Sequence, residues 1–173
     1  MAAHYREARL HTAVVELDAL RPTRDGGAET DAAKREARSR GLELTSQHLH
    51  AGDDVVVPQF LGRRAYVDDL ATVTMQQGAQ FIHVVLTADP SVVIDRFRAR
   101  RSGLRASSLV HPEDEVADED ISSTIAGAVE RIDDLCTQLS GVVRVSAAGS
   151  ATVTAQALSA AVDRTSGGET GGD

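Results

Sequence analysis

The chain of 173 residues has a single cysteine, no tryptophan and only 3% aromatic residues. One cysteine, Cys136, excludes a disulfide framework and any zinc site built from several cysteines. So few aromatic side chains disfavour a surface on which nucleic-acid bases stack. No apolar run approaches the roughly 20 residues that a membrane span needs, and the first residues form no apolar signal segment. These absences predict a soluble cytoplasmic protein.

Basic residues are also fewer than acidic ones, 18 against 26, which gives a net charge of −8. Such a surface repels phosphate backbones, so nucleic acid is not an expected partner. Lys34 is the one lysine and the other seventeen basic residues are arginines. A cluster of arginines is therefore informative only where it exceeds this background. The length and the hydrophobic share of 42% are typical of one globular domain.

Short apolar segments alternate with helical patterns along the chain. Strands are expected at 12–17, 55–57, 81–87 and 142–145, and helices near 31–51, 66–74, 90–101, 121–139 and from 151 onward. This alternation predicts an α/β fold of three layers, in which a doubly wound parallel sheet has helices on both faces. The domain is expected to cover residues 1–165, and the glycine-rich tail 166–173 is expected to be disordered.

Ligands of parallel sheets bind at the carboxyl ends of the strands, which directs attention to the residues that follow each strand. Asp18 follows the first strand, where a carboxylate could accept a proton from a substrate hydroxyl. The same position also suits a cap for the next turn. Gln59 follows the second strand and could fix a substrate or cap the next helix. Both interpretations of each residue remain open at this stage.

Arginines are concentrated after the third strand. Five of them, Arg96, Arg98, Arg100, Arg101 and Arg105, fall within ten residues where even scatter would place about one. Guanidinium groups bind phosphate oxygens through paired hydrogen bonds and stay charged, so the cluster indicates phosphate binding. The alternative is a solvated helix face that pairs in part with the acidic residues between 113 and 120.

The phosphate-binding signature GxxxxGK[ST] is absent from the 173 residues. Lys34 has no flanking glycines, and the pair Gly26 and Gly27 is not followed by a lysine. No metal-binding spacing such as HExxH occurs either. The sequence therefore offers arginines, but no glycine loop, as phosphate-binding groups.

Several segments in order carry a resemblance to a known family: 13–18 (AVVELD), 52–59 (GDDVVVPQ), 81–86 (FIHVVL) with Asp89 and Pro90, 96–101, and 142–149. Together they resemble the P-loop small-molecule kinases, the group that includes gluconate kinase, shikimate kinase and chloramphenicol phosphotransferase. The match covers most of residues 10–163. The resemblance implies transfer of the ATP γ-phosphoryl group to a hydroxyl of a small molecule, with ATP and Mg²⁺ as cofactors.

The resemblance also implies roles for individual residues. Asp18 would act as the base, with Arg21 and Gln59 binding the acceptor. The lid that grips the phosphates would contain Arg96, Arg100 and Arg101. The loop against the nucleotide base would contain Ala148, Gly149 and Ser150.

The chain departs from the family at its start. The family begins with a strand, the phosphate loop and a helix, and residues 2–10 would match only the end of that helix. The chain therefore looks truncated at its N-terminus and is expected to be inactive as written. The missing strand would lie mid-sheet, so the strands at 55–57 and 81–87 would face a gap or pair directly. A pseudokinase or small-molecule binding module is the alternative function, and an unrelated nucleotide-binding α/β protein is a third.

Overall fold

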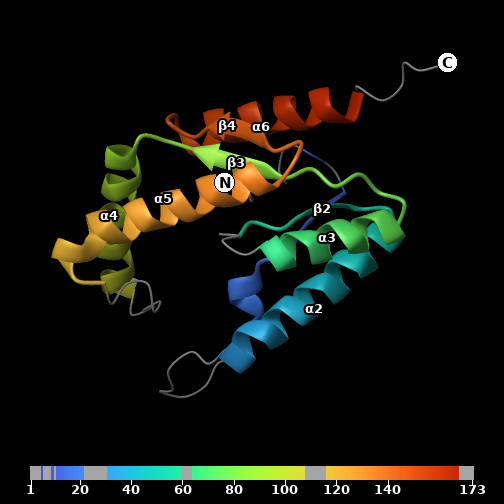
Figure 1. The fold of residues 1–173 in the computed structure, drawn as a ribbon, viewed down its shortest axis with the longest axis horizontal. Coiled ribbons are helices and arrows are strands. Elements are labelled where there is room, and N and C mark those ends of the chain that lie inside the picture. The colour runs from blue at the N-terminus through green and yellow to red at the C-terminus, as the bar shows by residue number, and fades with distance from the viewer. Residues whose placement is uncertain are drawn as a thin grey trace.

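A computed structural model describes residues 5, 9, 11–21, 31–59, 64–107 and 116–167 of the chain. Strands and helices alternate as the sequence predicts (Figure 1). In chain order they are β1 (Thr12–Val14), the 3₁₀ helix η1 (Leu17–Leu20), α2 (Asp31–His50), β2 (Asp54–Val56), α3 (Arg64–Gln76), β3 (Val84–Thr87), α4 (Pro90–Ser107), the 3₁₀ helix η3 (Asp118–Asp120), α5 (Ile121–Gln138), β4 (Val143–Ser146) and α6 (Ala151–Ser166).

The strands are parallel, but they form two separate pairs. β1 pairs with β2, with Ala13 opposite Val55, and β3 pairs with β4, with Leu86 opposite Val145. The expected continuous sheet is therefore fragmented within the described residues, and the break falls between β2 and β3. The sequence predicted a gap or a direct pairing at this place, and the structure shows no pairing between β2 and β3 among the described residues. Leu86 on β3 is 43% exposed.

The first half of the chain buries its apolar side chains between η1, α2 and α3. Val15, Leu17, Tyr66 and Leu70 form this core. The strand expected through residue 17 ends at Val14, because Leu17 turns away from the strand direction into η1 and packs in this core. Figure 1 shows α2 and α3 lying side by side, in agreement with their contacts.

The second half is built from β3, β4 and the last three helices. α6 packs on β4, and α4 packs on α5. α5 buries Ile121, Ile125 and Leu135, whereas Val129 is exposed and Cys136 is half-buried. The expected strand at 81–87 begins only at Val84. α6 reaches Ser166, the first residue of the expected tail, and residues 168–173 lie outside the described part.

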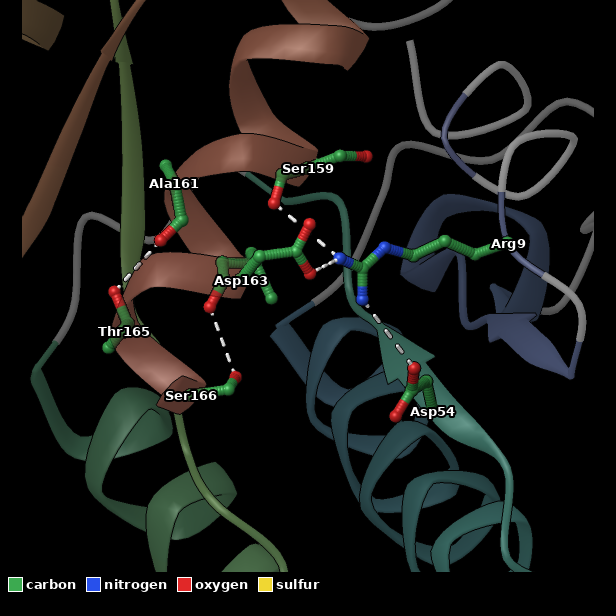
Figure 2. Close-up of polar contacts among 8 residues, drawn as sticks. Arg9, Asp54, Ser159, Ala161, Asp163, Thr165 and Ser166 are labelled. Carbon is green, nitrogen blue, oxygen red and sulfur yellow. Dashed lines mark hydrogen bonds and ion pairs between the residues drawn. The ribbon is translucent and has the colours of Figure 1, made fainter. Parts of the chain in front are cut away.

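Arg9 connects the two halves. Its guanidinium donates to the carboxylate of Asp163 and to the carbonyl of Ser159 on α6, and its Nη1 lies 3.9 Å from Oδ2 of Asp54 on β2 (Figure 2). The same guanidinium lies over the ring of Tyr5, 5.3 Å from its centroid. One side chain near the N-terminus thus links the first strand pair to the helix that covers the second.

Candidate functional site at the carboxyl ends of the strands

The residues singled out from the sequence follow the strands at their carboxyl ends. Asp18 and Arg21 come after β1 and Gln59 comes after β2. α4 begins three residues after β3, and residues 147–150 follow β4 directly. A hydrogen bond of 2.7 Å from the Ala147 amide to the Thr87 carbonyl holds the ends of β3 and β4 together.

Asp18 and Arg21 form an ion pair. The Nη2 atom of Arg21 lies 2.6 Å from Oδ1 of Asp18. Asp18 lies in η1, and Arg21, three residues later, directly follows the end of η1. Both side chains remain accessible, with exposed fractions of 29% for Arg21 and 53% for Asp18. Gln59 is half-buried, and within the described residues its side chain makes no hydrogen bond. The pair places a carboxylate and a guanidinium next to one another, which suits an acceptor with a hydroxyl and an anionic group.

The start of α4 is fixed by Asp89. Its Oδ1 accepts hydrogen bonds from the amide of Ser91 at 2.9 Å and from the hydroxyl of Ser91 at 2.6 Å. These two bonds stabilise the charged form, so the pKa of Asp89 lies below its usual value. The helix that carries the arginine cluster therefore begins where Asp89 and Pro90 predict.

The side chain of Arg96 binds the backbone of the loop after β4. Its Nη1 donates to the Ala147 carbonyl at 2.6 Å, and its Nη2 donates to the Gly149 carbonyl at 2.7 Å and to the Ala148 carbonyl at 3.4 Å. Ser150 completes the loop by capping α6, where its hydroxyl accepts from the Val153 amide. A residue expected in the phosphate lid and the loop expected against the base are thus in direct contact.

Arg100 and Arg101 have different surroundings. The guanidinium of Arg100 lies over the ring of Phe97, 5.3 Å from its centroid. Arg101 is only 8% exposed, and its Nη1 approaches Oδ1 of Asp118 in η3 to 2.8 Å. This approach lacks hydrogen-bond geometry, so the buried Nε and Nη1 of Arg101 have no hydrogen-bond acceptor in the described part of the chain. The side chain of Arg105 lies outside that part.

Asp118, the partner of Arg101, was indicated only indirectly by the sequence. The alternative interpretation of the arginines, partial pairing with the acids between 113 and 120, applies to Arg101. Asp118 is itself 80% exposed, so it provides the Arg101 guanidinium with a partner that water screens. Arg9 was not singled out at all, since its partners Asp54 and Asp163 are distant in sequence.

The described residues contain no group of three or more histidine, cysteine, aspartate or glutamate side chains that could hold a metal ion. None of the helices in this part of the chain is long and apolar enough to cross a membrane.

The order and packing of these elements define an α/β fold of parallel strands with its polar groups at the carboxyl ends. Among solved structures, the chain is similar to a gluconokinase from Sinorhizobium meliloti 1021, with a TM-score of 0.57 and 20% sequence identity. The likeness covers 95% of this chain and 83% of the gluconokinase. No protein-family model and no curated protein matches the chain. The fold is therefore gluconokinase-like, which confirms at the level of the fold the resemblance to P-loop small-molecule kinases.

Proposed function

We propose that the chain is the acceptor- and nucleotide-binding body of a small-molecule kinase. In this proposal it binds the phosphate groups of ATP through arginines of α4 and a small hydroxyl compound beside Asp18. Transfer of the γ-phosphoryl group would require the phosphate loop that the 173 residues do not contain. The observation that carries the proposal is the buried guanidinium of Arg101, whose Nε and Nη1 have no hydrogen-bond acceptor among the residues that the structure describes.

A buried cation with unsatisfied donors is costly unless an anion completes its surroundings. Asp118 offers one carboxylate, but its exposure limits what that pair contributes. Phosphate oxygens are acceptors that suit a guanidinium, and separate oxygens could accept from Nε and Nη1, which lie on different edges of the group. These two atoms therefore fit the phosphate groups of a nucleotide. No step proposed here depends on a metal ion.

The acceptor would bind at the pair of Asp18 and Arg21. Asp18 would accept the proton of the attacking hydroxyl, and Arg21 would hold an anionic group of the same molecule. Gluconate, the acceptor named by the similar gluconokinase, has both groups and is the first compound to test. Gln59 would contribute an amide to the acceptor's other hydroxyls.

Binding without transfer is the second candidate function. It is favoured by the absence of GxxxxGK[ST] from the 173 residues, because nothing else in the sequence supplies the loop amides and the lysine. A binding module would use the same residues, so only a transfer assay separates the two candidates.

Isothermal titration with Mg-ATP and with inorganic tripolyphosphate tests the proposal. We expect a Kd for Mg-ATP weaker than about 10 µM, which is about −7 kcal/mol. Replacing Arg101 by Met should weaken both ligands about tenfold or more, the equivalent of one charged hydrogen bond. Arg98→Ala on the same helix is the control and should change neither.

Failure of both ligands to bind at millimolar concentration would reject the proposal, and binding much tighter than 10 µM would require a further phosphate site. Incubation with ATP and gluconate then separates the candidates, since phosphorylated gluconate forms only if the chain itself transfers phosphate.

A further inference from the structure

Arg101 is fixed by burial rather than by hydrogen bonds. It is 8% exposed and lies on α4, the helix that packs on α5. A buried guanidinium is cut off from water, so it needs acceptors from the protein or from a ligand. Among the residues that the structure describes, its Nε and Nη1 have none. The side chain therefore presents a fixed positive charge whose donors are still open.

Asp118 is the anion beside this cation. Its Oδ1 lies 2.8 Å from Nη1 of Arg101, but without hydrogen-bond geometry. A second ion pair of the protein behaves differently, because Nη1 and Nη2 of Arg144 both donate to Oδ1 of Asp133 at 3.0 Å. The side chains of that pair are 49% and 55% exposed. A surface pair is thus hydrogen-bonded, whereas Asp118 approaches a buried cation without satisfying it.

The carboxylate of Asp118 is not fixed by the helices that begin near it. Residue 117 is the cap of η3, and neither η3 nor α5 has a side-chain cap hydrogen bond among the described residues. The side chain of Asp118 is 80% exposed, so it keeps most of its hydration and can turn into water at little cost. The pair therefore consists of a buried cation that stays and an exposed carboxylate that can leave.

From this arrangement we infer that Asp118 is an internal competitor of the phosphate group at Arg101. The inference rests on the proposed phosphate site. Without a ligand, the carboxylate supplies the negative charge next to the guanidinium. An arriving phosphate group must displace it, because two anions beside one guanidinium repel each other. The phosphate is the better ligand, since its oxygens can accept from donors that the carboxylate leaves open. Asp118 thus limits occupancy of the site and is not needed to hold Arg101.

Isothermal titration with inorganic tripolyphosphate tests the inference. Asp118→Asn removes the competing charge and should tighten binding about fivefold, which is about 1 kcal/mol. Asp118→Glu keeps the charge and should bind as the wild type does. Glu119→Gln in the same turn is the matched control, because it also removes one negative charge. It should change the affinity by less than about twofold, since water and salt screen an exposed charge.

The outcomes separate the inference from the proposed function. An unchanged affinity in Asp118→Asn, or an equal gain in Glu119→Gln, would overturn the inference and leave the proposed phosphate site standing. Weaker binding in Asp118→Asn would also overturn it, because Asp118 would then support Arg101, and the midpoint of urea unfolding should fall with it. A gain that persists when Asp118→Asn is combined with Arg101→Met would place the effect elsewhere and overturn it too. If neither the wild type nor Asp118→Asn binds tripolyphosphate at millimolar concentration, the proposed function is rejected and the inference with it.

Discussion

Gly41 lies in the middle of α2, where the helix contacts η1 and α3. A Cβ atom added at this position would lie 2.3 Å from Cδ2 of Leu17 and 2.8 Å from the hydroxyl oxygen of Tyr66. Carbon atoms in contact are normally about 3.5–4.0 Å apart, so Leu17 would have to move by more than about 1 Å. Leu17 and Tyr66 are 3% and 5% exposed, which leaves them little room to do so.

Two effects of Gly41→Ala oppose each other. Alanine favours the helix over glycine by about 1 kcal/mol. Overpacking of a core costs about 1–3 kcal/mol, and the short contact to Leu17 places this case in the upper part of that range. We therefore expect a net loss of about 1–2 kcal/mol in the free energy of unfolding, in spite of the better helix former.

Gly127 in α5 is the matched control. The nearest atom to a Cβ built there is Nη1 of Arg131, the end of a flexible side chain, at 3.4 Å. Gly127→Ala should therefore gain most of the helix preference, up to about 1 kcal/mol.

Urea unfolding measures both variants. The midpoint should fall by about 0.3–2 M for Gly41→Ala, given slopes of about 1–3 kcal/mol per M, and it should rise for Gly127→Ala. If both variants were stabilised alike, the close approach of α2 to η1 would be wrong. The displacement would also move Asp18, which follows Leu17 directly, so acceptor binding should weaken in Gly41→Ala.

Three further predictions concern charge and protonation. In a form of the protein that transfers phosphate, Asp18→Asn should lower kcat about 10²–10⁴-fold, the usual contribution of a general base, and an unchanged rate would leave Asp18 as a structural residue. Burial raises the pKa of Tyr66 to about 12 and also raises that of Tyr5. The unfolded chain releases these protons more easily than the native protein. The stability that these tyrosines contribute below their ordinary pKa of 10.0 should therefore be lost as the pH rises toward 12. A spectrophotometric titration should show both tyrosines ionising at higher pH in the native than in the urea-unfolded protein. A double-mutant cycle of Arg101→Met and Asp118→Asn should give a coupling below about 1 kcal/mol because Asp118 is exposed, and a much larger coupling would contradict that exposure.

Most of the elements could be predicted from the sequence because apolar periodicity reflects burial directly. The α5 pattern led to a helix at 121–139, and the structure has Ile121–Gln138. Strand bounds were less accurate, since an apolar residue can be buried without pairing. Leu17 and Phe81 both pack against the first core while lying outside β1 and β3.

The site could be predicted only as a set of positions at the strand ends. The sequence indicates that Asp18 and Arg21 follow one strand, but their pairing depends on the tight turn of η1. The contact of Arg96 with residues 147–149 joins segments about fifty positions apart, and no local pattern reports it. Arg9 and Asp163 are still further apart in the sequence, and their contact depends on how the two strand pairs come together.

The three arginines of α4 differ because of the pitch of the helix. Each residue turns the helix by about 100°, so Arg100 lies about 40° around the axis from Arg96 and Arg101 about 140° from it. Arg96 and Arg100 therefore share a face, but Arg100 lies about 6 Å further along the axis, and its guanidinium lies over the ring of Phe97. Arg101 turns toward the opposite face, where α4 packs on α5 and Asp118 is close by. A cluster that is continuous in sequence is thus divided in space, and a phosphate group that reaches Arg101 would approach from the side of η3 and α5 rather than from the loop that Arg96 holds.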